Sequence, residues 1–239
     1  MQIAESFLSR ILFEDNHLLI INKLPSEIIQ GDKTGDMPLS DLAKAYIARK
    51  YNKPGNAFLG VVHRIDRPVS GAVIFARTSK ALTRLNEMLR KKELKKKYWA
   101  VVKNPPSEPD DTLIHHLQKN EKQNKSYPVD PGKKNSKRAE LKYRIICKSR
   151  DYHLVEVELI TGRHHQVRAQ LAAIGCPIRG DLKYGFDRSN NDASIHLHAR
   201  SLCFTHPVTS KEINIVAPVP EDALWKYFEK EVQHPIHNI

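Results

Sequence analysis

The residues most able to do chemistry are one carboxylate and two guanidinium groups in a single loop. Asp66 lies between Arg64 and Arg67, and apolar runs at 59–62 and 72–75 flank the loop. The arginines favour the ionised form of the carboxylate, and the apolar runs predict two short buried strands that present it at a strand end. An ionised carboxylate can act as a nucleophile or stabilise positive charge. The alternative is an ion pair in a solvated basic loop.

A second segment places basic side chains directly before an aromatic one. Lys95, Lys96 and Lys97 precede Tyr98, and the apolar residues that follow predict a strand. A run of charges is usually a solvated face, but lysines that lead into a tyrosine near a candidate site are well placed to hold phosphate groups.

A third segment predicts a strand that ends at 161–162 and a helix that starts near Arg163. In such a helix Arg163, Gln166 and Gln170 form a polar stripe, and apolar residues form a second stripe toward the core. The helix dipole adds its positive end to Arg163 and Arg168. The alternative is an ordinary amphipathic helix with exposed polar residues.

Together, in this order and at these separations, the three segments closely resemble the RluA-type family of RNA pseudouridine synthases. The match runs from about residue 15 to about residue 218. The resemblance implies that Asp66 is the catalytic aspartate, that Tyr98 closes on the base, and that Arg163 is the basic residue paired with Asp66. Lys23 matches a Lys-Pro element of the family in which Leu24 is inserted.

The reaction implied by the resemblance breaks the bond from ribose to the ring nitrogen, turns the detached uracil in place and rejoins it through carbon 5. Nothing is oxidised or reduced, so we expect no cofactor and no metal. Water must be kept out because it would divert the reaction into hydrolysis. A paired or stacked uridine must first leave its stack, and Arg64 is a candidate to fill the vacated space.

The composition indicates an anionic partner. The formal net charge is +12 and the pI is about 9.6. A membrane is the less favoured partner, because the sequence has neither a long uncharged apolar stretch nor a separate basic amphipathic helix. With the resemblance, this predicts structured RNA, transfer RNA or ribosomal RNA or both, as the substrate. The residues that we expect to bind it are Arg64, Arg67, Lys95, Lys96, Lys97, Gln166 and Arg168.

The chain reads as an α+β protein built on a mixed, mainly antiparallel β-sheet with flanking helices and loops. We expect one pseudouridine synthase catalytic domain over residues 1–239, without an appended N-terminal RNA-binding domain. A hairpin is predicted at 11–22 and a helix from Pro38. Residues 119–137 are polar without an apolar period, which predicts a long mobile loop that faces RNA.

The amino end and the three cysteines indicate the cellular location and the thiol state. The amino end carries no secretory signal, so we expect a cytoplasmic protein, and we expect it to be a monomer. Cys147, Cys176 and Cys203 are odd in number, widely spaced and set among apolar neighbours, which predicts reduced, buried thiols.

Two other classes of function are open. A metal-dependent hydrolase could use the histidines at 164–165 or the pair at 196 and 198. Adjacent histidines on a helix point apart, however, and the second pair has no nearby acidic third ligand. A non-catalytic RNA-binding or ribosome-assembly protein would keep the basic surface, but it would not need the three candidate catalytic residues together.

Overall fold

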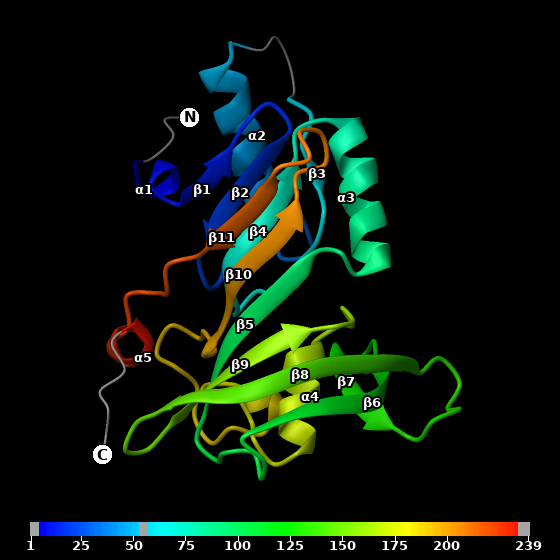
Figure 1. Cartoon of the computed structure of the whole chain (residues 1–239), viewed down its shortest axis with the longest axis vertical. Coiled ribbons are helices and arrows are strands. Elements are labelled where there is room, and N and C mark those ends of the chain that lie inside the picture. Colours follow the sequence, from blue (N-terminus) through cyan, green and yellow to red (C-terminus); the bar gives the residue numbers. More distant parts are fainter. Residues whose placement is uncertain (1–4, 53–56, 234–239) are drawn as a thin grey trace. The chain divides into compact units, whose positions relative to one another are not determined.

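The computed structural model describes residues 5–52 and 57–233. The chain forms two compact units, which are described one at a time. Unit 1 consists of Met1–Leu94 and Ala199–Pro218, and unit 2 consists of Lys95–His198 and Val219–Ile239. Figure 1 labels the helices and strands of both. No helix among the described residues combines the length and the apolar character that crossing a membrane requires.

Unit 1 contains a sheet in which β1, β2, β4 and β10 are neighbours in that order, β11 pairs with β10, and β3 pairs with β4. The pairings β1–β2, β2–β4, β3–β4 and β10–β11 are antiparallel. The elements are α1 (Glu5–Leu8), β1 (Ile11–Glu14), β2 (Leu18–Lys23), α2 (Leu39–Lys50), β3 (Gly60–Val61), β4 (Ser70–Ala76), α3 (Ser79–Lys91), β10 (Leu197–Thr205) and β11 (Glu212–Val216). The hairpin at 11–22, the helix after Pro38 and the two strands around the Asp66 loop are therefore confirmed.

The core of unit 1 lies on β2 and β4. Both strands carry near-continuous apolar runs, and every residue of β4 is buried. Such runs, rather than alternating ones, are typical of strands covered on both faces. Leu85 of α3 joins Leu18 and Ile74 in one apolar cluster, and each fully buried side chain of this size contributes about 1.5–3 kcal/mol.

Gly71 allows β4 and β10 to approach each other directly after the Asp66 loop. Its φ is +117°, and a Cβ at this position would lie 2.4 Å from the carbonyl oxygen of Ala199. Glycine meets both conditions without steric cost. The strand that follows Asp66 is thereby fixed against its neighbour.

Unit 2 contains a sheet with the strand order β5-β9-β8-β6-β7, in which each neighbouring pair is antiparallel. The elements are β5 (Lys95–Val102), β6 (Asp110–Asn120), β7 (Lys125–Val129), β8 (Lys137–Lys148), β9 (His153–Leu159), α4 (Gln166–Ala173), the short 3-10 helix η1 (Leu182–Tyr184) and α5 (Ala223–Gln233). The predicted α+β fold with a mainly antiparallel sheet is confirmed.

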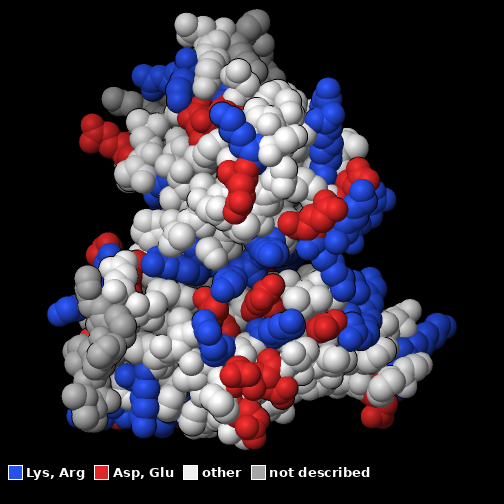
Figure 2. All heavy atoms as spheres, viewed as in Figure 1, with Lys and Arg blue, Asp and Glu red and all other residues white. Residues whose placement is uncertain are grey.

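The two faces of the unit 2 sheet have different partners. Ala169 of α4 packs with Leu117 and Ala139 on one face. Trp225 of α5 packs with Trp99 on the other. α4 lies behind these strands in Figure 1, so Figure 2, which has the same viewpoint, shows the face opposite to α4.

That face of the unit 2 sheet carries both signs of charge, as the lower half of Figure 2 shows. Lys97 and Arg144 approach Glu156, with nitrogen–oxygen distances of 2.9 and 3.7 Å. Within β8 itself, Arg138 Nη1 lies 2.5 Å from Glu140 Oε2. Opposite charges on neighbouring strands stabilise an antiparallel pair, so these cations are balanced within the fold.

The prediction of a mobile loop at 119–137 is wrong. Residues 125–129 form β7, which pairs with β6 as far as Asn120 opposite Lys125. The strand has no apolar period because polar contacts hold it: the N–H of the buried Ser126 donates to the Tyr184 hydroxyl at 2.9 Å. The three cysteines are free as predicted, but only Cys176 is buried and the other two are half-buried.

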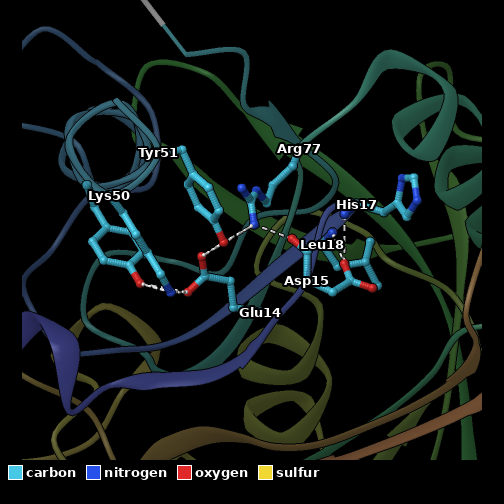
Figure 3. A network of polar contacts seen from close by, with 8 residues as sticks. Glu14, Asp15, His17, Leu18, Lys50, Tyr51 and Arg77 are labelled. Carbon is cyan, nitrogen blue, oxygen red and sulfur yellow. Dashed lines mark hydrogen bonds and ion pairs between the residues drawn. The ribbon is translucent and has the colours of Figure 1, made fainter. Parts of the chain in front are cut away.

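A polar network holds the end of unit 1 where β1 turns into β2 (Figure 3). Glu14 Oε2 accepts hydrogen bonds from Tyr46 Oη at 2.6 Å and Lys50 Nζ at 2.7 Å, and Oε1 accepts one from Tyr51 Oη at 2.9 Å. Arg77 Nη1 lies 3.3 Å from Oε1. Burial acts to raise the pKa of Glu14, but the hydrogen bonds from Lys50, Tyr46 and Tyr51 outweigh it and lower the pKa below its ordinary value.

Arg77 extends this network to the hairpin. Its Nη1 donates to the carbonyl oxygen of Asp15, and its Cζ lies 4.3 Å above the Tyr51 ring. The Asp15 carboxylate accepts the N–H groups of His17 and Leu18, each at 2.7 Å. One network thus joins the hairpin turn, the end of α2 and the end of β4.

We expect Glu14→Gln to lower the free energy of unfolding by about 1–3 kcal/mol near neutral pH, because charged hydrogen bonds become neutral ones. The difference from wild type should shrink as the pH falls below about 4.5, the ordinary pKa of a glutamate. Glu14 of the unfolded chain takes up a proton first there, and the stability that comes from the lowered folded-state pKa is lost as the pH falls through that pKa. Urea denaturation near pH 7 and near pH 3.5 measures both effects. Glu87, exposed and paired with Lys91 on α3, is the matched control, and equal losses in Glu14→Gln and Glu87→Gln would contradict the role of the network.

Candidate active site

Asp66 begins a tight turn in unit 1. Its carbonyl oxygen accepts the N–H of Val69 at 3.0 Å, so Arg67 and Pro68 occupy the corner. The Asp66 side chain is half-buried, whereas Ile65 before it and Val69 after it are buried. Apolar anchors on both sides therefore present the carboxylate at the boundary between core and solvent.

Lys23, at the end of β2, is fully buried and binds the backbone of this turn. Its Nζ donates to the carbonyl oxygens of Leu24 at 2.7 Å, Arg67 at 3.1 Å and Val69 at 2.7 Å. Three acceptors match the three N–H groups of an ammonium. Two of them belong to residues that directly follow Asp66 in the turn, so the lysine fixes the backbone that carries the carboxylate.

Lys23 also interacts electrostatically with the carboxylates near this turn. Burial lowers the pKa of Lys23 to about 7, while the nearby carboxylates of Glu27 and Asp66 act in the opposite direction and favour the ammonium. Within unit 1, the Asp66 carboxylate thus favours the charged form of a buried lysine on β2. The arginines that flank Asp66 in the sequence did not indicate this electrostatic interaction.

The two arginines beside Asp66 extend toward solvent. Arg64 is exposed, and Arg67 places its Nη2 2.6 Å from Asp36 Oδ2. Both members of this ion pair are about half exposed, and such pairs contribute about 0–1 kcal/mol. Replacing Asp36 by another anion at Arg67 would therefore cost little.

Tyr98 lies in unit 2, in β5, opposite Val157 of β9. It is 6 % exposed. Successive side chains of a strand point to opposite faces, so Tyr98 shares a face with Lys96, whereas Lys97 and Trp99 lie on the other. The lysine run therefore divides between two faces.

Gln166 closes the turn that carries Arg163. Its Oε1 accepts hydrogen bonds from the Arg163 N–H at 2.9 Å and from Thr161 Oγ1 at 2.8 Å. Its Nε2 donates to the carbonyl oxygen of Glu140 at 3.0 Å. Since Glu140 belongs to β8, the amide fastens the turn to the sheet.

Arg163 is exposed and precedes the helix rather than starting it. α4 begins at Gln166, and His165 before it has a left-handed φ of +52°. Arg163 Nε donates to the carbonyl oxygen of Arg138 at 2.9 Å. Two contacts, at its N–H and its Nε, thus orient a guanidinium whose terminal nitrogens are at the exposed end of the side chain.

Comparison with known proteins decides the family. Residues 17–173 match the model of the RNA pseudouridylate synthase family. The chain belongs to this family. The members of this family are isomerases that act on RNA. The resemblance noted in the three sequence segments is therefore confirmed.

Relatives match along nearly the whole chain. Ribosomal large subunit pseudouridine synthase C of Vibrio cholerae is 34 % identical over 225 residues, which are 90 % of this chain and 68 % of the relative. Uncharacterized RNA pseudouridine synthase YlyB of Bacillus subtilis is 32 % identical over 223 residues, 92 % of this chain and 72 % of the relative. The solved structure titled Human RNA Pseudouridylate Synthase Domain Containing 4 shares the fold, with a TM-score of 0.78, 23 % identity and coverage of 96 % of this chain and 95 % of that one.

The predicted site residues of this pseudouridine synthase divide between the units. Unit 1 holds Asp66, Arg64 and Arg67, and unit 2 holds Tyr98, Arg163, Gln166, Arg168 and the three lysines. Within unit 2, Arg163 and Gln166 are in direct contact. The catalytic roles stay predictions.

Arg168 and Gln166 have roles inside unit 2. Arg168 is buried and binds Asp181 with two contacts, Nε to Oδ2 at 2.7 Å and Nη2 to Oδ1 at 2.8 Å. Its guanidinium also lies 5.0 Å from the centre of the Tyr184 ring. Removing one partner of such a buried pair typically costs about 3–5 kcal/mol. That either side chain contacts RNA stays a prediction.

The adjacent histidines do not point apart as expected for a helix. The rings of His164 and His165 stack, with centroids 3.8 Å apart, because the backbone of His165 is left-handed ahead of the helix. His164 contacts Ser126 Oγ and Asn124 Oδ1 at 2.9 and 3.1 Å. In the described part of the chain, no group of three or more His, Cys, Asp or Glu side chains is arranged to hold a metal ion.

Lys23→Met should slow pseudouridine formation more than it weakens RNA binding, because the Asp66 turn loses its anchor while the exposed cations remain. It should also destabilise the fold, since each buried carbonyl left without a donor costs about 1–3 kcal/mol. The measurements are kcat, the RNA dissociation constant and urea denaturation, with the exposed Lys33→Met as the matched control. A variant with normal kcat would show that the turn holds Asp66 without the lysine.

Proposed function

We propose that this protein isomerises specific uridines in ribosomal or transfer RNA to pseudouridine, with Asp66 as the catalytic carboxylate. The observation that carries the proposal is the family match over residues 17–173, within which a buried lysine fixes the turn of Asp66. The relatives named for the ribosomal large subunit favour ribosomal RNA as the substrate. This substrate would place the enzyme in the cytoplasm with the ribosome.

In the proposed reaction the bond between ribose carbon 1′ and ring nitrogen 1 breaks, and a bond between carbon 1′ and ring carbon 5 forms. Carbon 5 gives up its proton and nitrogen 1 gains one, so that atoms and electrons balance without a cofactor. An ionised Asp66 would act as nucleophile or stabilise positive charge at the sugar. Its half-buried position suits this task, because bulk water competes less there.

Tyr98 and Arg163 are proposed to act with Asp66 in one catalytic domain. Tyr98 is a nearly buried aromatic ring, able to stack on a uracil and to move a proton through its hydroxyl. Arg163 is held at its N–H and its Nε, which leaves its terminal nitrogens to face an anion. Arg64 and Arg67, both exposed, are proposed to hold RNA, and Arg64 to fill the space of the flipped base.

The test is incubation of the purified protein with RNA transcripts in the presence of a chelator and without nucleotides, followed by mapping of pseudouridine. Asp66→Asn should fold and bind RNA like wild type but form no pseudouridine, because it keeps the size of the side chain and removes its charge. Asp41→Asn, an exposed carboxylate on α2, is the matched control. Turnover by Asp66→Asn beyond what deamidation restores would remove Asp66 from the chemistry, and a wild type that binds RNA without converting it would make the protein a non-catalytic RNA binder.

Arg163→Met should lower kcat by about 10²–10³-fold, the usual loss when one preorganised charge donor is removed. Because the side chain is exposed, its melting temperature should change little. Arg163→Lys should recover only part of the rate, since lysine restores the charge without the hydrogen bond from Nε to Arg138. Arg144→Met, at an arginine on the charged face of the same sheet, is the control, and equal rates for Arg163→Met and Arg144→Met would exclude Arg163 from the active site.

A further inference from the structure

The three lysines before Tyr98 differ sharply in their surroundings. Lys95 is exposed, and Lys97 forms an ion pair with Glu156 at 2.9 Å. Lys96 is half-buried, and this burial lowers its pKa. Across the residues that the structure describes, its ammonium has no hydrogen-bond or ion-pair partner. A half-buried cation without a partner inside the protein is unfavourable, so an explanation is needed for why it lies there.

The strand register brings Lys96 to the turn before Arg163. Lys97 of β5 pairs with Glu158 of β9, so the next position along β5 places Lys96 beside Leu159, where β9 ends. The chain then turns, and a Cβ added to Gly162 would lie 3.7 Å from Lys96 Nζ. The ammonium therefore lies over the glycine of the turn.

Lys96 and Arg163 thus both lie beside a stretch of backbone that carries no side chain at Gly162. The Nε of Arg163 donates to the carbonyl oxygen of Arg138, and its main-chain N–H donates to Gln166 Oε1. A tetrahedral anion whose negative charge is shared by two oxygens suits a lysine, which acts as a point charge, together with an arginine fork.

We propose that Lys96 and the Gly162–Arg163 turn form a binding site for one backbone phosphate of the substrate RNA, next to the target uridine. The site deepens the proposed function and rests on it. Lys96 shares its face of β5 with Tyr98, so the phosphate held there lies near the residue proposed to close on the base. Lys96 is in this way a ligand for one defined phosphate, whereas Lys95 and Lys97 add only general charge.

The test measures the affinity for a series of RNAs, in each of which one backbone phosphate is replaced by a neutral methylphosphonate. Wild type should lose about tenfold in affinity at one linkage beside the target uridine. Lys96→Gln should lose about as much with unmodified RNA and should no longer respond to the change at that linkage, and its salt slope should fall by about 0.7. Lys95→Gln, at the exposed neighbour, should keep the wild-type linkage profile. Inorganic phosphate is added in a separate arm: millimolar phosphate that abolishes the linkage effect would mean a free-phosphate site and would overturn the RNA assignment.

A second pair of variants keeps the proposal testable if Lys96→Gln fails to fold. The backbone of Gly162 is outside the left-handed region and a Cβ fits, so Gly162→Asp places a carboxylate against the ammonium, while Gly162→Asn is the uncharged isostere. Gly162→Asp should lose the linkage effect and bind RNA at least tenfold more weakly than Gly162→Asn. Equal binding by the two, or a wild-type linkage profile in Lys96→Gln, would overturn the phosphate site. Because these readouts are binding constants, they stand apart from the conversion assay, in which absence of pseudouridine with wild type would instead refute the proposed function.

Discussion

The Asp66 turn depends on the hydrogen bonds that one buried lysine, Lys23, donates to three carbonyl oxygens. Lys23 ends a strand whose first four residues are apolar and buried, and the pairing of β2 with β4 holds its ammonium in the core. Transfer of a charge into such surroundings is unfavourable unless its hydrogen bonds are met. The turn after Asp66 supplies two of those acceptors, and the lysine and the turn therefore stabilise each other.

In unit 2, a neutral side chain fixes the turn that carries Arg163. The amide of Gln166 joins the turn of Arg163 to β8, and it does so without adding charge beside a guanidinium. An amide can accept and donate at once, which a carboxylate or an amine could not do here. Both units thus hold an exposed or half-exposed charged residue on a backbone turn whose rigidity comes from a buried side chain.

Charge distribution separates the cations that fold the protein from those free to meet RNA. Arg168 with Asp181, Lys97 with Glu156, and Arg77 with Glu14 are satisfied inside the protein. A net charge of +12 consequently overstates the surface available to a polyanion. The cations that matter for recognition are those with a weak partner or none, because an RNA phosphate need not displace a buried carboxylate to reach them.

The sequence by itself determined the family, the α+β class and the residues that could do chemistry, since motif order and apolar periodicity are local properties of the chain. It mistook β7 for a loop, because that strand is held by the Tyr184 hydroxyl and its pairing with β6 rather than by apolar side chains. It predicts that Gln166 and Arg168 bind RNA, and it did not indicate that both are buried and make contacts inside unit 2. Only tertiary structure decides which polar groups find partners, because residues distant in sequence, such as Lys23 and Val69 or Lys96 and Gly162, meet through strand register.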